Sequence, residues 1–204
     1  GGDTTRGPLN ICITVFGEVP AGAALLRSGA RAGDDIWVSG TPGEARLALE
    51  VFRGTIALPA DAFDTARRRM EQPTPRVALG QALRGIATSA VDVSDGLIGD
   101  LGHILASSGV GATLDVDAAT ALISVDTGNL GEELRRTCAL SGGDDYELVF
   151  TAPASARNAV GQAGMDSSTR VTRIGRIEAD AGLRIVDAAG APVSQRFGSF
   201  DHFV

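Results

Sequence analysis

The sequence is poor in cysteine and histidine, the residues that build disulfide frameworks and zinc sites. Among 204 residues there are two cysteines, Cys12 and Cys138, and two histidines. The cysteines lie far apart, and neither belongs to a C-x-x-C pair. A structural zinc site is therefore disfavoured. We expect two reduced, packed thiols, as is usual in a cytoplasmic protein, and a single disulfide is the alternative.

A basic excess and long apolar runs are also missing. Acidic residues outnumber basic ones by 25 to 18, which gives a formal net charge of −7. That balance argues against a non-specific nucleic-acid binder, whose footprint is a basic excess. No apolar run approaches the roughly 20 residues that a transmembrane helix needs, and the first residues do not form a signal peptide. The composition predicts a cytoplasmic protein that binds neither nucleic acid nor membrane.

What is present is the composition of an ordinary globular protein, with 44% hydrophobic residues. The length allows one sizeable core, or one full domain plus part of another. The chain starts without methionine and inside a glycine-rich loop. We therefore expect a truncated form of a longer parent.

Local patterns predict helices and strands in mixed order. Apolar and β-branched runs indicate strands at 9–16, 35–40, 86–93, 112–116 and 145–152, with two more within 169–187. Helical spacing of apolar residues indicates helices at 23–30, 44–52, 60–71, 76–86, from about 97 to Gly109, 130–140 and 154–163. The segment Thr41-Pro42-Gly43-Glu44 has the spacing of a capping box. Because the order lacks a regular βαβ rhythm, it favours an α+β fold.

The most informative segment is Val91–Leu97, which reads Val-Asp-Val-Ser-Asp-Gly-Leu. A buried strand here delivers Asp92 and Asp95 to the start of a helix. Carboxylates at such a turn suit magnesium, which takes one or two of them together with waters and phosphate oxygens. Free backbone N–H groups at the helix start can also receive a phosphate. The simpler alternative is that Ser94 or Asp95 only caps the helix.

Two further segments combine glycines with acids. Gly1–Gly7 places two glycines beside Asp3 and two threonines, a loop that can approach phosphate closely. Leu140–Leu148 places two glycines and two adjacent acids before an apolar strand. Ordinary turns with solvated acids are the alternative for both segments. Neither is a P-loop, because the G-x-x-x-x-G-K-[ST] pattern is missing throughout the chain.

Read together and in order, these segments resemble the thiamine-monophosphate kinases over essentially the whole chain. The blocks that carry the resemblance are Gly-Gly-Asp-Thr-Thr-Arg-Gly-Pro-Leu at 1–9, Arg-Ser-Gly-Ala at 27–30, Gly-Asp-Asp-Ile-Trp-Val-Ser-Gly-Thr-Pro-Gly at 33–43, Asp-Val-Ser-Asp-Gly-Leu at 92–97, Ser-Gly-Gly-Asp-Asp-Tyr-Glu-Leu at 141–148 and Phe-Asp-His-Phe at 200–203. The resemblance implies the two-domain architecture shared with aminoimidazole ribonucleotide synthetase, with an α+β carboxyl-terminal domain. It also implies transfer of the γ-phosphoryl group of ATP to thiamine monophosphate, with magnesium.

The same resemblance implies roles for individual residues. By their match to the family pattern, the ATP-binding residues are Gly2, Asp3, Arg27 and Ser94. The implied magnesium ligands are Asp3, Asp92 and Asp95. The implied contacts to thiamine monophosphate are Asp144 and Phe200, an aromatic that suits a cationic heteroaromatic ring. No catalytic acid or base is assigned.

Two departures from the family pattern affect these expectations. Position 144 is an aspartate where the family commonly has glutamate, so its side chain reaches less far. The family's amino-terminal domain, through which the parent is implied to form a homodimer, is absent. We therefore divide the chain into 1–19, a remnant loop and last strand of that domain, and 20–204, the carboxyl-terminal α+β domain.

Three functions remain open on the sequence alone. The first is a thiamine-monophosphate kinase whose truncation impairs its activity. The second is a same-superfamily ATP-dependent enzyme with a different acceptor, because a fold does not fix a substrate. The third is a non-catalytic fragment that binds nucleotide weakly.

Overall fold

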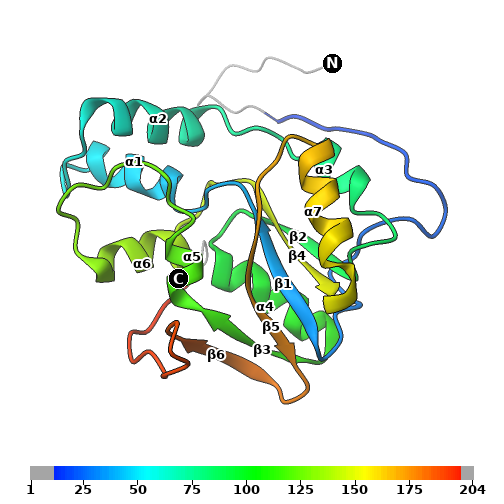
Figure 1. Cartoon of the computed structure of the whole chain (residues 1–204). Helices are drawn as coiled ribbons and strands as arrows, with labels where there is room; N and C mark the ends of the chain where they lie inside the picture. The colour runs from blue at the N-terminus through cyan, green and yellow to red at the C-terminus, as the bar shows by residue number, and fades with distance from the viewer. Residues whose placement is uncertain (1–11, 199–204) are drawn as a thin grey trace.

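The computed structural model describes residues 12–198, and its central element is one six-stranded sheet (Figure 1). The strands are β1 (Asp34–Ser39), β2 (Ser89–Val93), β3 (Gly111–Asp115), β4 (Glu147–Pro153), β5 (Val171–Glu178) and β6 (Gly182–Val186). Their order across the sheet is β2-β4-β1-β5-β3-β6. Neighbouring strands pair antiparallel, except β3 and β6, which pair parallel. This mixed topology confirms the predicted α+β class.

Helices cover both faces of the sheet. They are α1 (Glu44–Phe52), α2 (Ala60–Glu71), α3 (Val77–Ala82), α4 (Leu97–Ser108), α5 (Val116–Thr120), α6 (Glu132–Ser141) and α7 (Arg157–Asp166), with a 3-10 turn at Ala154–Ala156. Figure 1 shows α3 and α7 together on one side of the sheet, and α1 lying beside α2 beyond one end of it. The pocket described below lies between α1 and the loops that precede α4 and β4.

Period-two alternation along the strands divides the core into two layers. In β4, Val149 belongs to the cluster under α4, whereas Phe150 belongs to the cluster under α3 and α7. The apolar stripe predicted for the helix after residue 93 is confirmed, because Leu97, Leu101 and Ile104 are fully buried in the first cluster. The sheet is therefore packed on both faces, which fixes the strand ends that carry the site.

A third, smaller cluster joins α1 to α6 and contains Cys138. Burial raises the pKa of the Cys138 thiol to about 12. Cys12 is free as well, but it is exposed. The expectation of two reduced thiols agrees with the structure, while packing of both thiols is wrong, because the segment around Cys12 lies on the surface.

The amino-terminal part of the described chain departs from two predictions. No strand forms at 12–16 and no helix at 23–30. Ile13, Val15 and Phe16 are between 80% and 92% exposed. Among the described residues, this apolar and β-branched segment has no neighbouring strand with which to pair. Backbone pairing is what stabilises an extended segment. Within 23–30, Leu25 and Ala30 do pack against the core, but a helix this short is marginal in water. The division of the chain at residue 19 stays a prediction.

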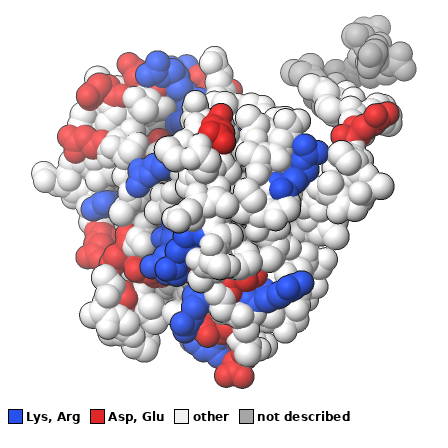
Figure 2. Space-filling view, turned by 45° about the vertical axis from the view of Figure 1, so that its right-hand side comes forward, with Lys and Arg blue, Asp and Glu red and all other residues white. Residues whose placement is uncertain are grey.

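Charges of both signs mix on the surface. Figure 2 shows arginines interspersed with acidic side chains over one face of the described residues. All 18 basic residues of the chain are arginines, so cationic recognition of an anion here relies on guanidinium rather than ammonium groups. Among the helices that the structure describes, none has the length and apolarity to cross a membrane.

Candidate active site

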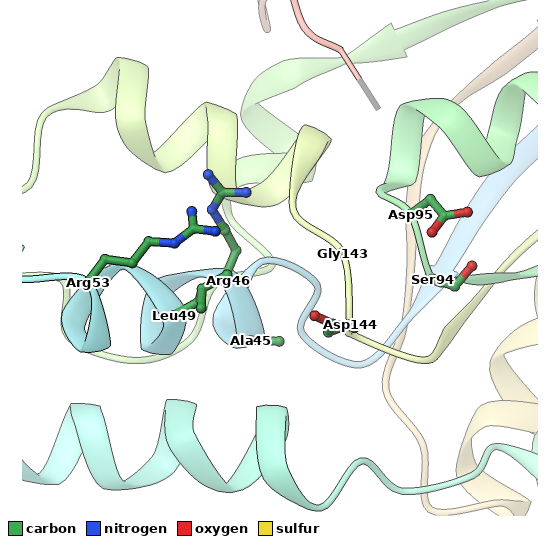
Figure 3. Close-up of a pocket in the computed structure, with 8 residues that line it drawn as sticks. All are labelled: Ala45, Arg46, Leu49, Arg53, Ser94, Asp95, Gly143 and Asp144. Carbon is green, nitrogen blue, oxygen red and sulfur yellow. The ribbon is translucent and has the colours of Figure 1, made fainter. Parts of the chain in front are cut away.

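A pocket of about 260 Å³ lies between α1 and the loops that precede α4 and β4 (Figure 3). Its lining combines two arginines, two aspartates and a serine with small or apolar residues: Ala45, Arg46, Leu49, Arg53, Ser94, Asp95, Gly143 and Asp144. Figure 3 shows both arginines on the α1 side and Ser94 and Asp95 on the opposite side. Both arginines pair with the one carboxylate of Glu50, Arg46 Nε at 2.7 Å and Arg53 Nη1 at 3.1 Å, so the α1 side keeps a net positive charge. The opposite side offers hard oxygen donors to a ligand.

The connection between β2 and α4 forms one wall of the pocket. The carboxylate of Asp100 accepts hydrogen bonds from the backbone N–H groups of Ser94 (2.9 Å) and Asp95 (3.0 Å). The N-cap position of α4 is held by Gly96, not by Ser94 or Asp95. Gly96 has a φ of 114°, and a Cβ there would lie 3.1 Å from the Ser141 carbonyl oxygen. Only glycine satisfies both conditions without strain, so the turn has one tight conformation.

The loop before β4 packs backbone to backbone against this turn. The N–H of Asp144 donates to the Ser94 carbonyl, and the N–H of Tyr146 donates to the Val93 carbonyl, each at 2.9 Å. Asp144 and Tyr146 have φ values of 65° and 50°, a conformation that is uncommon outside glycine and recurs at functional sites. A Cβ at Gly143 would lie 2.5 Å from the Ser94 carbonyl oxygen. The close approach of the two walls therefore requires glycine at position 143.

Asp145 lies between these two exposed residues but is itself buried. Its carboxylate accepts the Gly43 N–H at 2.9 and 3.0 Å and also the N–H of Ala45. Burial raises the pKa of Asp145 well above its usual range, although these two N–H groups lower it. Asp145 thus replaces the predicted capping box, which does not form because the Thr41 hydroxyl donates to the Glu44 side chain instead.

The acids around the pocket influence one another. Burial raises the pKa of Asp100, and the charges of Asp95 and Asp92 raise it further, against the two backbone N–H groups that lower it. Burial and the neighbouring Asp144 raise the pKa of Tyr146, with smaller contributions from Asp92 and Asp95. These shared effects indicate that three exposed or half-buried aspartates lie near one another beside the pocket.

Behind the pocket loop, a buried ion cluster anchors the start of β4. Glu147 is fully buried and pairs with Arg69 of α2 and with Arg76, whose Nε lies 2.6 Å from Glu147 Oε2. The Ser39 hydroxyl of β1 also donates to Glu147. A buried carboxylate needs such partners to offset the cost of desolvation. The cluster connects α2 and the start of α3 to the centre of the sheet.

The structure brings some of the predicted residues together and leaves others apart. Ser94, Asp95 and Asp144 line one pocket, while Asp92 is exposed on the edge strand β2 beside it. Arg27 is not brought to the pocket. Its carbonyl accepts a hydrogen bond from Ser108, at the far end of α4, and a helix of 12 residues is about 18 Å long. Its predicted contact to ATP stays a prediction.

The other predicted site residues, Gly2, Asp3 and Phe200, lie outside the described residues. Sequence reasoning also missed residues that the structure places at the site. Arg46 and Arg53 line the pocket, and Asp100 and Asp145 hold its walls. The one available signal was an acid at position 100 inside an otherwise apolar stripe, since a buried charge needs a partner.

The side chains at the pocket fit one particular way of binding magnesium. Among the described residues, no group of three or more His, Cys, Asp and Glu side chains could hold a metal ion by itself. Asp95, Ser94 and nearby Asp92 nevertheless offer oxygen donors only, as magnesium prefers, and magnesium commonly takes one or two carboxylates plus substrate phosphates. The arrangement fits a magnesium ion that binds together with a nucleotide, rather than one held in a protein cage.

Comparisons with known proteins identify the family of the chain. Residues 31–188 match the family described as AIR synthase related protein, C-terminal domain. Over its full length the chain is 46% identical to a thiamine-monophosphate kinase from Salmonella typhimurium, of which it covers 62%. The resemblance seen in the sequence blocks is therefore confirmed.

Solved structures give the same result. A thiamine-monophosphate kinase from Stenotrophomonas maltophilia K279a is 43% identical, with a TM-score of 0.75 over 86% of this chain and 56% of that one. A structure described as AaThiL complexed with AMPPCP and TMP is 26% identical, with a TM-score of 0.64 over 88% of this chain and 54% of that one. The chain spans 62% of the length of the first curated relatives it matches. It belongs to the family of AIR synthase related proteins, whose carboxyl-terminal domain it contains.

Proposed function

We propose that this chain carries the carboxyl-terminal part of a magnesium-dependent kinase that transfers the γ-phosphoryl group of ATP to thiamine monophosphate. In this reaction the bond from the γ-phosphorus to the β,γ-bridging oxygen of ATP breaks. A new bond forms from that phosphorus to a phosphate oxygen of thiamine monophosphate, so the products are ADP and thiamine diphosphate. The observation that carries the proposal is that Ser94, Asp95 and Asp144, predicted from separate segments, line one pocket.

The relatives support the nature of both ligands. A relative 46% identical along this whole chain is a thiamine-monophosphate kinase, and a structural neighbour was solved with the ATP analogue AMPPCP and with TMP. In our proposal Ser94 contacts the nucleotide, together with Gly2, Asp3 and Arg27. Asp144 and Phe200 contact the thiamine monophosphate.

The residues of this chain act mainly by positioning, which is how most phosphoryl transfer is catalysed. We propose that Asp92, Asp95 and Asp3 hold magnesium, which when bound neutralises charge on the phosphates. The turn before α4 and the loop before β4 hold Ser94 and Asp144 at a fixed separation. The arginines on the α1 side add positive charge for the anionic groups of the ligands.

Three further assignments belong to the same proposal. Residues 1–19 belong to an amino-terminal domain that completes the site, and residues 20–204 form the carboxyl-terminal domain. The parent protein is a homodimer through that amino-terminal domain. The protein works in the cytoplasm, a location that its two free cysteines favour.

Isothermal titration with AMPPCP, with magnesium or with EDTA, tests the nucleotide half of the proposal. We expect magnesium-dependent binding that weakens at least tenfold in Asp95→Asn and in Asp92→Asn, because each loses one carboxylate charge. Asp180→Asn, an exposed acid in the turn between β5 and β6, is the matched control and should bind like the original chain. Equal affinity with magnesium and with EDTA would contradict the metal assignment.

Formation of thiamine diphosphate from ATP and thiamine monophosphate, followed by chromatography, tests the acceptor. The same aspartate variants should lower the rate at least a hundredfold, because the charge on the transferred group would be left uncompensated. Magnesium-dependent AMPPCP binding without any thiamine diphosphate would favour a different acceptor or a non-catalytic fragment.

A further inference from the structure

Asp100 is a buried acid that the proposed reaction does not use directly. It lies in the first turn of α4, is 3% exposed, and is surrounded in the helix sequence by the buried Leu97, Leu101 and Ile104. A carboxylate in such a place costs free energy unless hydrogen bonds compensate it. An apolar residue would pack at this position without that cost, so the acid has a specific task.

That task is visible in its two hydrogen bonds. A single oxygen, Oδ2, accepts both the N–H of Ser94 at 2.9 Å and the N–H of Asp95 at 3.0 Å. The N–H of Asp100 itself donates to the Gly96 carbonyl at 3.0 Å. Asp100 therefore bonds, through its side chain and its backbone N–H, to three consecutive residues of the turn, Ser94, Asp95 and Gly96.

The opposite side of the turn is held by another segment. The carbonyl of Ser94 accepts the N–H of Asp144. Each of the two peptide units beside Ser94 is thus held from two sides, its N–H by Asp100 and its carbonyl by the loop before β4. Rotation of either peptide would move the side chains of Ser94 and Asp95 relative to Asp144 across the pocket.

We propose that Asp100 is a positioning residue for phosphoryl transfer, which orients Ser94 and Asp95 toward magnesium and nucleotide without touching either ligand. The inference rests on the proposed function for its consequence, but the orientation itself is a property of this chain. A displacement of about 1 Å in such a site can lower the rate of reaction about a hundredfold.

Three variants of this chain separate positioning from general stability. Asp100→Ala removes the acceptor, and Asp100→Asn restores it, because an amide oxygen can accept the same two N–H groups. Ile104→Ala, one turn further along α4, is the matched control: it leaves a cavity in the same helix packing but lies away from the pocket lining. The melting temperature of each variant is measured first, and all later measurements are made where every variant is folded.

The first readout is amide hydrogen exchange followed by NMR. We expect the exchange rates at Ser94 and Asp95 to rise at least tenfold in Asp100→Ala relative to Ile104→Ala, and to return close to the original values in Asp100→Asn. Unchanged exchange at these two amides in Asp100→Ala would overturn the inference. This readout needs no ligand, so it decides the orientation even if the proposed function fails.

The second readout is titration with AMPPCP and magnesium. Asp100→Ala should weaken binding at least tenfold, while Asp100→Asn and Ile104→Ala should bind within threefold of the original chain. If Asp100→Ala and Ile104→Ala weakened AMPPCP binding equally, Asp100 would have only a structural role, and the proposal would be overturned. An original chain that does not bind the nucleotide would count against the proposed function and against the role of Asp100 in it, leaving the orientation decided by exchange alone.

Discussion

Two buried aspartates of this chain respond to pH in opposite directions, because their partners differ. Hydrogen bonding to Arg157 lowers the pKa of Asp35, with help from the charges of Arg157 and Arg173 and against the effect of burial. Burial raises the pKa of Asp145, whose partners are backbone N–H groups. Asp145 binds its proton more tightly in the folded state, so its contribution to stability declines as the pH rises above about 3.9, the usual aspartate pKa.

Asp35→Asn tests the aspartate whose pKa is lowered in the folded state. The folded pKa of Asp35 lies below the unfolded value of about 3.9, so its contribution is present above that pH and is lost as the pH falls through the folded pKa. We expect the variant to lose about 1–2 kcal/mol of unfolding free energy at pH 7, since its half-exposed arginine partners limit the gain. Urea unfolding of the original chain and of the variant, from pH 7 to pH 2.5, measures this difference in free energy. A difference that stays constant down to pH 2.5 would contradict the assignment.

At the residue scale, the sequence indicated three residues that line the pocket but not the buried acids that hold its walls. Ser94, Asp95 and Asp144 were found because they stand in short, ordered blocks that can be read from the chain alone. Asp100 and Asp145 were not found, because what makes them important is a contact to backbone N–H groups. The contact of Asp145 spans 102 positions of the sequence, from Gly43 to Asp145, and no local pattern shows it.

At the scale of elements, the ion cluster around Glu147 holds α2 and α3 to the sheet. Glu147→Ala would leave Arg69 and Arg76 without their shared partner, with side chains only 20% and 14% exposed. Removing one partner from a buried ion pair costs about 3–5 kcal/mol. We expect a loss of that size in the free energy of unfolding, measured with urea.

Glu178→Ala provides the comparison within the same sheet. Glu178 pairs with Arg176, whose side chain is 61% exposed, and a surface pair of this kind contributes about 0–1 kcal/mol. Similar losses in Glu147→Ala and Glu178→Ala would show that the buried cluster does not anchor the helices.

Most element positions were predictable, and the failures have physical reasons. The helix at 60–71 matches the prediction, because Pro59 and Pro73 flank it. The end of α1 at Phe52 also matches, and Gly54, with a φ of 71°, follows it. The short α5 was missed, since its N-cap comes from Asp115, which also ends β3. Of the strand expected at 9–16, the described residues 12–16 form none, because strand formation depends on a partner and composition cannot supply one.

At the scale of the whole molecule, the family match begins only at residue 31. Residues 12–19 are all exposed in the structure. Deleting residues 1–19 should therefore change the melting temperature by less than about 2 °C, well below the shift of a lost core contact in a domain of this size. The same deletion should weaken magnesium-dependent AMPPCP binding at least tenfold, because Asp3 is lost. Calorimetry and titration measure the two effects, and a large drop in melting temperature would contradict the domain division.

The backbone ties around the pocket also bear on how such a site can change in evolution. Asp145 joins the loop before β4 to the start of α1, and the Asp144 N–H joins that loop to the turn before α4. Loss of either hydrogen bond would disturb the loop before β4, the start of α1 and the turn before α4 together. The outward side chains of α1, at positions such as Arg46 and Leu49, border the same cavity without holding its backbone. New ligand preferences are therefore most accessible through substitutions along α1, where the shape and charge of the cavity can vary while its backbone frame is retained.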